Sequence, residues 1–229
     1  MASVKLCLVA GLLAAGFGCG SEKGQNITVK GSDTMVILGQ RWAEKYMHHQ
    51  KGVTVQVTGG GSGTGIAALI NGGTQICAAS RPMKEKERQQ ARDKWKKEVK
   101  ETPVALDGLA IFLHENNPIQ ELSIPQLEQI YRGRITDWKE VGGTPGRIVC
   151  YSRENNSGTY LYFKEHVLKD QDFAATVQTL PGTAAVINAV SKDPASIGYG
   201  GIGYSKGVKA IRVSPGEGKP GVEPTMDHV

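Results

Sequence analysis

The chain is poor in aromatic residues and in cysteine, and it has no apolar run long enough for a permanent membrane anchor. Trp, Tyr and Phe make up 6% of its 229 residues, and no basic stretch is interleaved with aromatic side chains that stack on bases. The formal net charge is +5, but acids alternate with the basic residues at 84–97, which is typical of a solvated helix face. These shortages argue against a nucleic-acid partner.

Four cysteines are present, and only Cys77 and Cys150 lie outside the N-terminal apolar region. Each lies in an apolar, strand-like run, which favours two buried free thiols. A disulfide between them stays open, because an exported protein meets oxidising conditions. No Cys or His spacing fits a metal site, so neither a metal nor any other cofactor is predicted.

The N-terminus predicts export. Lys5 precedes an apolar run at residues 6–17, which has the length of a signal peptide. The segment Gly16-Phe17-Gly18-Cys19 at its end resembles a bacterial lipobox, although Gly16 stands where lipoboxes usually carry Leu. We expect a signal peptide at 1–19, lipidation of Cys19 and a polar linker at 20–26. A plain cleaved signal peptide is the alternative.

Apolar strand patterns alternate with helical patterns through the rest of the chain. Short alternating runs at 26–30 and 53–57 are each followed by a turn and an amphipathic helix. The same order recurs in the second half, where the run at 147–151 precedes a helix. The alternation predicts an α/β protein with two lobes, each a mostly parallel sheet flanked by helices. Ligands of such sheets lie at the carboxyl ends of the strands.

Three strand-to-helix turns combine glycine with serine or threonine, at residues 31–34, 59–65 and 156–159. Glycines allow the backbone to approach a ligand closely, and a helix start offers unpaired N–H groups and a positive dipole end. The glycine-rich turn at 59–65 fits neither the dinucleotide pattern, nor the P-loop, nor the esterase elbow. It predicts an anion-binding turn, with a plain flexible turn as the alternative.

The third of these turns also carries a permanent cation. Ser157 occupies an N-cap position, Gly158 and Thr159 open the helix, and Arg153 lies four residues upstream. Donors, one positive charge and a helix start describe an anion site. By itself the segment also fits an ordinary capped helix with a surface arginine. Two similar turns in the first half favour a clamp in which two lobes close on one anion.

Five motifs occur in the order found in one family, from Gly31-Ser32-Asp33-Thr34 and Gly61-Ser62-Gly63-Thr64-Gly65 to Ile197-Gly198-Tyr199. Between them lie the segment 135–143 and Arg153 with Ser157-Gly158-Thr159. In these motifs the chain resembles the phosphate-binding proteins of bacterial phosphate ABC transporters, the PstS family, from about residue 27 to 226. The resemblance implies a type II periplasmic-binding-protein fold, with two lobes joined by crossing strands that close on one phosphate.

Carried over position by position, the resemblance implies a set of phosphate-binding residues in both lobes. Ser80 and Arg81 add donors and a second cation, and Asp107 adds a candidate acceptor. The predicted site is therefore Ser32, Thr34, Met35, Ser62, Ser80, Arg81, Asp107, Arg153, Ser157, Gly158 and Thr159.

Ser80 departs from the family pattern, because some relatives carry there an aspartate that accepts the proton of hydrogen phosphate. Asp107 is the candidate replacement, and its alternative role is a turn or hinge residue capping Gly108. Without an acceptor, discrimination between phosphate and other tetrahedral oxyanions is expected to be poor.

The predicted organisation places the first lobe at 27–106, the second at 107–200 and a shortened return toward the first lobe at 201–229. The ending suggests a compact variant or a truncated gene product. The resemblance implies a periplasmic or cell-surface, monomeric, non-enzymatic receptor that captures inorganic phosphate for permease and ATPase subunits. Its membrane contact would be the lipid anchor alone. Alternatives are an oxyanion-sensing or signalling lipoprotein and a receptor for another tetrahedral oxyanion.

Overall fold

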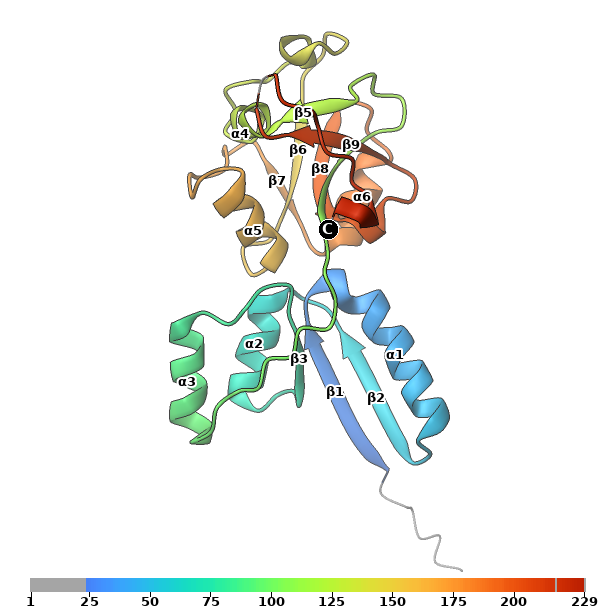
Figure 1. Cartoon of the computed structure of the whole chain (residues 1–229), viewed down its shortest axis with the longest axis vertical. Helices are drawn as coiled ribbons and strands as arrows, with labels where there is room; N and C mark the ends of the chain where they lie inside the picture. The colour runs from blue at the N-terminus through green and yellow to red at the C-terminus, as the bar shows by residue number, and fades with distance from the viewer. Residues whose placement is uncertain (1–23, 217, 229) are drawn as a thin grey trace, which may run out of the picture.

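A computed structural model describes residues 24–216 and 218–228, which form two lobes, one above the other in Figure 1. The first lobe contains β1 (Gln25–Gly31), η1 (Asp33–Met35), α1 (Val36–His49), β2 (Val53–Thr58), α2 (Ser62–Asn71), β3 (Ile76–Ala78) and α3 (Glu85–Trp95). The second contains β4 (Leu109–Leu113), β5 (Glu121–Ser123), α4 (Ile124–Tyr131), η2 (Trp138–Val141), β6 (Val149–Arg153), α5 (Gly158–His166), β7 (Gln178–Leu180), α6 (Thr183–Val190), β8 (Ser196–Gly201), η3 (Ile202–Tyr204) and β9 (Lys209–Ser214). A last turn, η4 (Met226–His228), lies near the junction of the lobes.

The first lobe is built on a three-stranded parallel sheet of order β2-β1-β3. Val29 of β1 pairs with Val57 of β2 on one side and with Ile76 of β3 on the other. Helix α1 lies on one side of this sheet, and α2 and α3 lie on the other (Figure 1). All three strands therefore point their carboxyl ends toward the second lobe, which brings the turns before α1 and α2 to the junction.

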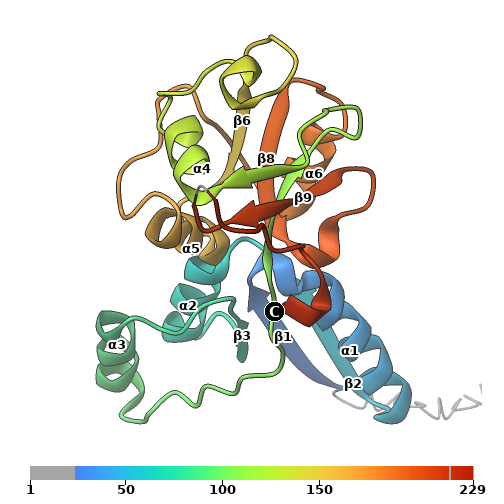
Figure 2. The same ribbon diagram turned by 45° about the horizontal axis from the view of Figure 1, so that its top comes forward.

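The second lobe has a six-stranded sheet of order β5-β9-β4-β8-β6-β7. Strand β4 runs antiparallel to both of its neighbours, whereas β6 is parallel to β7 and β8. Figure 2 shows α4 and α5 on one side of the sheet and α6 on the other. The prediction of an α/β protein with mostly parallel sheets is confirmed, with an antiparallel centre in the second lobe.

An aromatic cluster fixes the strand that carries Arg153. The rings of Phe163 and Tyr199 stack with centroids 4.0 Å apart, and Tyr131 meets Phe163 edge-on at 4.7 Å. All three side chains are fully buried. The hydroxyl of Tyr199 is 2.7 Å from Ser152 Oγ, so the cluster holds β6 in place through its last two residues.

One described segment, residues 96–108, joins the lobes, since every element up to α3 lies in the first lobe and β4 to β9 lie in the second. The apolar run at 102–113 is long enough for one buried strand, but only Leu109–Leu113 forms β4. The preceding residues are extended and exposed, and Leu106 is 78% exposed. These residues pair with no strand among the described residues, so the crossing is a single tether rather than the crossing strands that the resemblance implied.

Two predicted boundaries are wrong. The return toward the first lobe was placed at 201–229, yet β9 lies inside the second sheet, between β4 and β5. Its alternating residues, such as the buried Ile211, complete the second core. The linker was placed at 20–26, but Gln25 and Asn26 already pair with β2. The predicted signal peptide and Cys19 lie outside the described residues.

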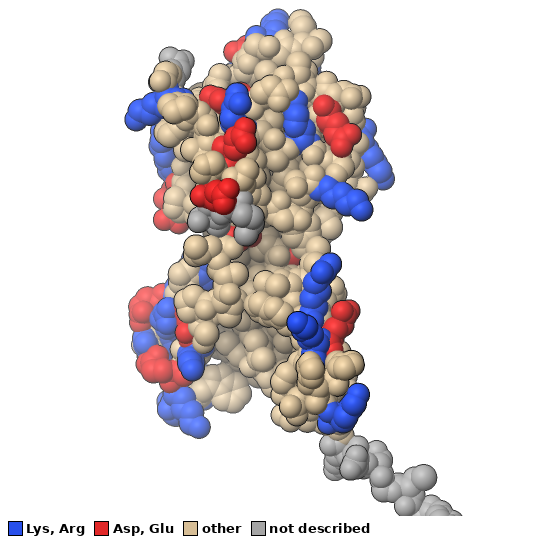
Figure 3. Space-filling view, turned by 45° about the vertical axis from the view of Figure 1, so that its right-hand side comes forward, with Lys and Arg blue, Asp and Glu red and all other residues tan. Residues whose placement is uncertain are grey.

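The first lobe has an open apolar groove of about 1630 Å³ beside its sheet. Its walls include Trp42 and Tyr46 of α1, Ile76 of β3 and Trp95 of α3, each 45–49% exposed. The face in Figure 3 shows the charged side chains of this lobe at its two flanks, with uncharged residues covering the middle. Within the described residues, no helix is long and apolar enough to cross a membrane.

Candidate functional site

The predicted clamp forms where helix starts from both lobes meet. Ser157 caps α5 as expected, accepting a hydrogen bond from the Tyr160 backbone N–H at 3.3 Å. Gly158 and Thr159 are the first residues of the helix, and both are buried. Because the first N–H groups of a helix have no partner inside it, this end of α5 supplies donors toward the first lobe.

Ser62 and Ser80 of the first lobe lie directly against this helix start. Ser62 opens α2, is fully buried, and accepts a hydrogen bond from the Ser80 backbone N–H at 3.1 Å. A β-carbon added to Gly158 would lie 2.8 Å from Ser62 Oγ and closer still to Ser80 Oγ. The structure therefore brings together the predicted site residues Ser62, Ser80 and Gly158. It leaves no space for a side chain at position 158.

Arg153 ends β6 inside the same junction and is 1% exposed. Its Nη1 donates to Thr183 Oγ1 at 2.7 Å, and its Nη2 donates to Asp33 Oδ2 at 2.5 Å. Its Nε is buried and has no hydrogen-bond partner among the described residues. A buried donor on a permanent cation is costly to leave unpaired, so this N–H is available for an anion.

Asn156 is a second link between the lobes. Its Nδ2 donates to Gly60 O at 3.1 Å and to Thr64 Oγ1 at 2.9 Å. Its main-chain carbonyl oxygen accepts a hydrogen bond from Gly63 N at 2.9 Å. With the Asp33–Arg153 pair, these bonds hold the lobes against each other. Because a single segment joins the lobes, these hydrogen bonds between them are what keep the two lobes together. The lobes are in contact in this structure, which is therefore a closed form of the clamp.

The second predicted cation, Arg81, is engaged elsewhere. Its two terminal nitrogens donate to the two carboxylate oxygens of Glu87, each at 2.8 Å. This pairing lowers the pKa of Glu87 and raises that of Arg81. The bidentate geometry fixes the guanidinium on its own lobe, and its buried Nε has no partner among the described residues.

Asp107 lies in the tether, close to the first helix start. A β-carbon on Gly201 would lie 2.8 Å from Asp107 Oδ2 and 3.4 Å from Thr34 Cγ2. Although the residue is open to solvent on one side, partial burial raises the pKa of its carboxyl. Hydrogen bonds from the backbone N–H groups of Gly108 and Ile202 lower the pKa of this carboxyl. The bond from Gly108 accords with the capping role considered above.

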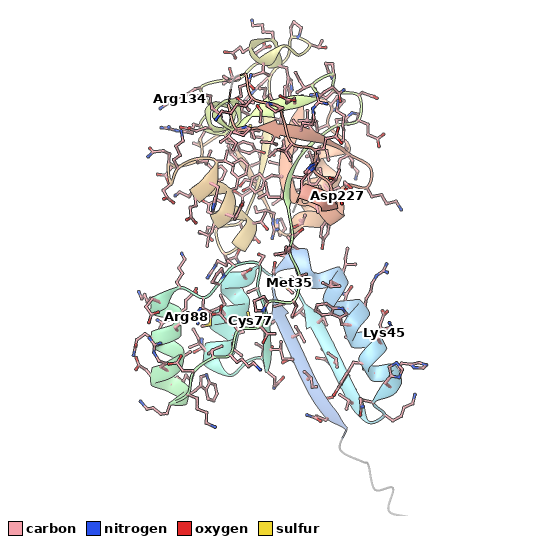
Figure 4. The ribbon with its side chains drawn as sticks, viewed as in Figure 1. Met35, Lys45, Cys77, Arg88, Arg134 and Asp227 are labelled. Carbon is pink, nitrogen blue, oxygen red and sulfur yellow. The ribbon has the colours of Figure 1, made fainter. Side chains whose placement is uncertain are left out.

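The first helix start supplies the remaining predicted residues. Ser32 is buried, and its Oγ is 2.8 Å from Thr34 Oγ1. Ser32 precedes η1 but makes no side-chain cap to it, so its hydroxyl is not used to start the helix. Met35 lies at the end of the first lobe that faces the second (Figure 4).

Three residues at the junction were not predicted as part of the site. Asp33 belongs to the first motif but not to the predicted site, yet its Oδ1 accepts from Gly60 N at 2.9 Å while Oδ2 binds Arg153. Thr183 begins α6 and is fully buried beside Arg153. Asn156 links the lobes. The available signal was Asp33 itself, a carboxylate within a turn that otherwise offers donors.

The two internal cysteines are separate free thiols. Burial raises the pKa of Cys150 to about 12 and that of Cys77 to about 11, so neither is a reactive thiolate at neutral pH. Among the described residues, no group of three or more His, Cys, Asp or Glu side chains is arranged to hold a metal ion.

Two α/β lobes that close on a donor-lined junction define a two-lobed binding protein. A family model described as "PBP superfamily domain" matches residues 19–226. The chain therefore belongs to the PBP superfamily, and the relatives below place it in the PstS family within it.

Two relatives are named phosphate-binding protein PstS. The Pseudomonas aeruginosa protein is 36% identical over 211 residues, covering 86% of this chain, and the chain spans only 65% of that relative's length. The Staphylococcus saprophyticus protein is 32% identical over 230 residues, covering 97% of this chain and 71% of its own.

Solved structures show the same architecture. A Clostridium perfringens substrate-binding protein with bound phosphate has a TM-score of 0.77 and 32% identity, and the match covers 86% of this chain and 79% of that one. An ABC-type phosphate transport receptor from Vibrio cholerae has a TM-score of 0.64 and 32% identity, covering 88% and 80%. The type II periplasmic-binding-protein fold predicted from the motifs is confirmed.

Proposed function

We propose that the protein is an extracytoplasmic receptor that captures inorganic phosphate for an ABC-type uptake transporter. The observation that carries this proposal is the buried Nε of Arg153, which has no hydrogen-bond partner in the part of the chain that the structure describes and lies in a junction lined by helix starts from both lobes. The relatives named for phosphate binding, and the phosphate-bound Clostridium perfringens structure, support the choice of anion.

In this proposal the anion is held mainly by neutral donors. Hydroxyl groups come from Ser32, Thr34, Ser62, Ser80, Ser157 and Thr159, and backbone N–H groups come from Met35 and Gly158. Arg153 supplies the positive charge, and Arg81 and Asp107 lie at the margin. A hydrogen bond to a charged group contributes about 1.5–3 kcal/mol, so a handful of them supports tight binding after the cost of ordering the lobes.

Calorimetry with purified protein tests the binding step. We expect a phosphate Kd in the micromolar range or below, because several charge-assisted bonds form at one anion. Arsenate should bind similarly, as it has the same shape and protonation. Phosphate binding weaker than millimolar would contradict the proposal.

The transport step is separate, and it assigns permease and ATPase subunits as partners. The protein would bind phosphate as a monomer, be held at the membrane through a lipid on Cys19, and perform no chemistry on the ligand. Cells that lack the protein should take up labelled phosphate several-fold more slowly at limiting concentration. Unchanged uptake together with an altered phosphate-starvation response would instead favour the signalling role.

A further inference from the structure

The glycine-rich turn at the start of α2 holds a side chain that comes from the other lobe. Asn156 of the second lobe donates from Nδ2 to Gly60 O and to Thr64 Oγ1, and its main-chain oxygen accepts from Gly63 N. Figures 1 and 2 both place α5, which begins two residues after Asn156, next to α2. Residues 60–64 therefore form a socket that binds Asn156 through both its side chain and its main chain.

The shape of the socket depends on residues that lack a side chain. A β-carbon on Gly61 would lie 2.8 Å from the main-chain oxygen of Asn156 and 3.1 Å from its Oδ1. A β-carbon on Gly63 would lie 3.1 Å from the same main-chain oxygen. Gly61 also has a φ of +87°, which other residues rarely adopt. Part of the glycine content of this turn thus makes room for Asn156 rather than for an anion.

The chemistry of the socket selects an amide. Gly60 O can only accept a hydrogen bond, so the nitrogen of the amide has to face it. Asn156 Oδ1 is buried and has no hydrogen-bond partner among the described residues. An unpaired buried acceptor costs part of what the two Nδ2 bonds contribute, so the net effect of the side chain is moderate.

Asn156 acts on the closed form of the protein. Its hydrogen bonds run from the second lobe to the first, so they exist only while the lobes touch. Interactions made in one conformation alone shift the equilibrium toward that conformation. An anion enclosed between the lobes leaves after they open, so these bonds slow its release.

We propose that Asn156 and the socket form a clasp that sets how long the protein retains its anion. The inference rests on the proposed function and extends it from affinity to the rate of release. Asn156 is a positioning residue, because it holds the start of α5 against Ser62 and Ser80 and makes its own bonds to protein atoms. The rate of capture is nearly independent of the clasp, since an anion enters while the lobes are apart.

The test measures the release of radiolabelled phosphate from the full chain into an excess of unlabelled phosphate, by rapid filtration. Asn156→Ala removes both Nδ2 bonds and keeps the main-chain bond to Gly63. We expect release to be about tenfold faster and association to change less than twofold. Asn155→Ala removes the same amide group from the exposed neighbouring position, and should release phosphate as the wild type does.

A second pair of variants tests the clasp from the first lobe. Thr64→Val keeps the shape of the side chain but removes the hydroxyl that Nδ2 reaches, and should speed release about threefold. Thr64→Ser restores a hydroxyl, and its release rate should return close to that of the wild type. In the Asn156→Ala background Thr64→Val should add no further acceleration, because the shared bond is already lost.

Several outcomes would overturn the clasp. These are a wild-type release rate in folded Asn156→Ala, a loss of affinity that appears in the association rate, and additive acceleration in the double variant. If the wild-type protein binds no phosphate, the proposed function itself fails, and small-angle scattering in phosphate-free buffer then decides the clasp. A larger radius of gyration in Asn156→Ala than in the wild type would support it, and equal radii would refute it.

Discussion

Replacing Arg153 with alanine should weaken phosphate binding by at least about 1000-fold, which corresponds to about 4 kcal/mol. The change removes a fully buried cation whose Nε has no hydrogen-bond partner among the described residues, and it also breaks the Asp33 link between the lobes. Calorimetry measures the loss. The fold should survive, because the apolar core clusters of the second lobe do not include Arg153.

Two controls separate charge from packing in this experiment. Arg153→Met keeps much of the buried volume but not the charge, and should lose binding as severely as the alanine variant. Arg134→Ala removes an arginine from the end of the second lobe that lies away from the junction (Figure 4), and should bind as the wild type does. Wild-type affinity in either Arg153 variant would refute the assignment of the site.

Local features of this fold could be predicted from the sequence. The cap at Ser157 and the helix that begins at Gly158 depend on residues within one turn, and both were found as expected. The alternation of strands and helices likewise predicted the α/β class. Such features need only neighbouring residues, so the sequence pattern contains the required information.

Long-range pairings could not be predicted in the same way. The Asp33–Arg153 bond joins residues 120 positions apart, and nothing near either residue identifies its partner. The apolar pattern of β9 shows that a strand forms but does not say which sheet it enters. Arg81 is a further example. Its positive charge suggested a role in the anion site, but in the structure its guanidinium is paired with Glu87.

Replacing Gly158 with alanine should weaken phosphate binding about 100-fold by preventing full closure, a loss of about 2.7 kcal/mol. The new methyl group would collide with Ser62 and Ser80 of the other lobe. Helix α5 itself should not suffer, because alanine is a better helix former than glycine. Calorimetry measures the affinity, and small-angle scattering should show a more open shape.

A matched control for this change is Gly146→Ala, because a β-carbon there meets nothing closer than 4.0 Å. That variant should bind phosphate normally. Thermal unfolding should show that Gly158→Ala is at least as stable as the wild type, so that lost binding reflects blocked closure rather than damage to the lobe. Normal affinity in Gly158→Ala would mean that the lobes bind the anion without the close approach of Ser62 and Ser80 to α5. The helix starts would then act through longer contacts, and the closed arrangement described above would not be the binding form.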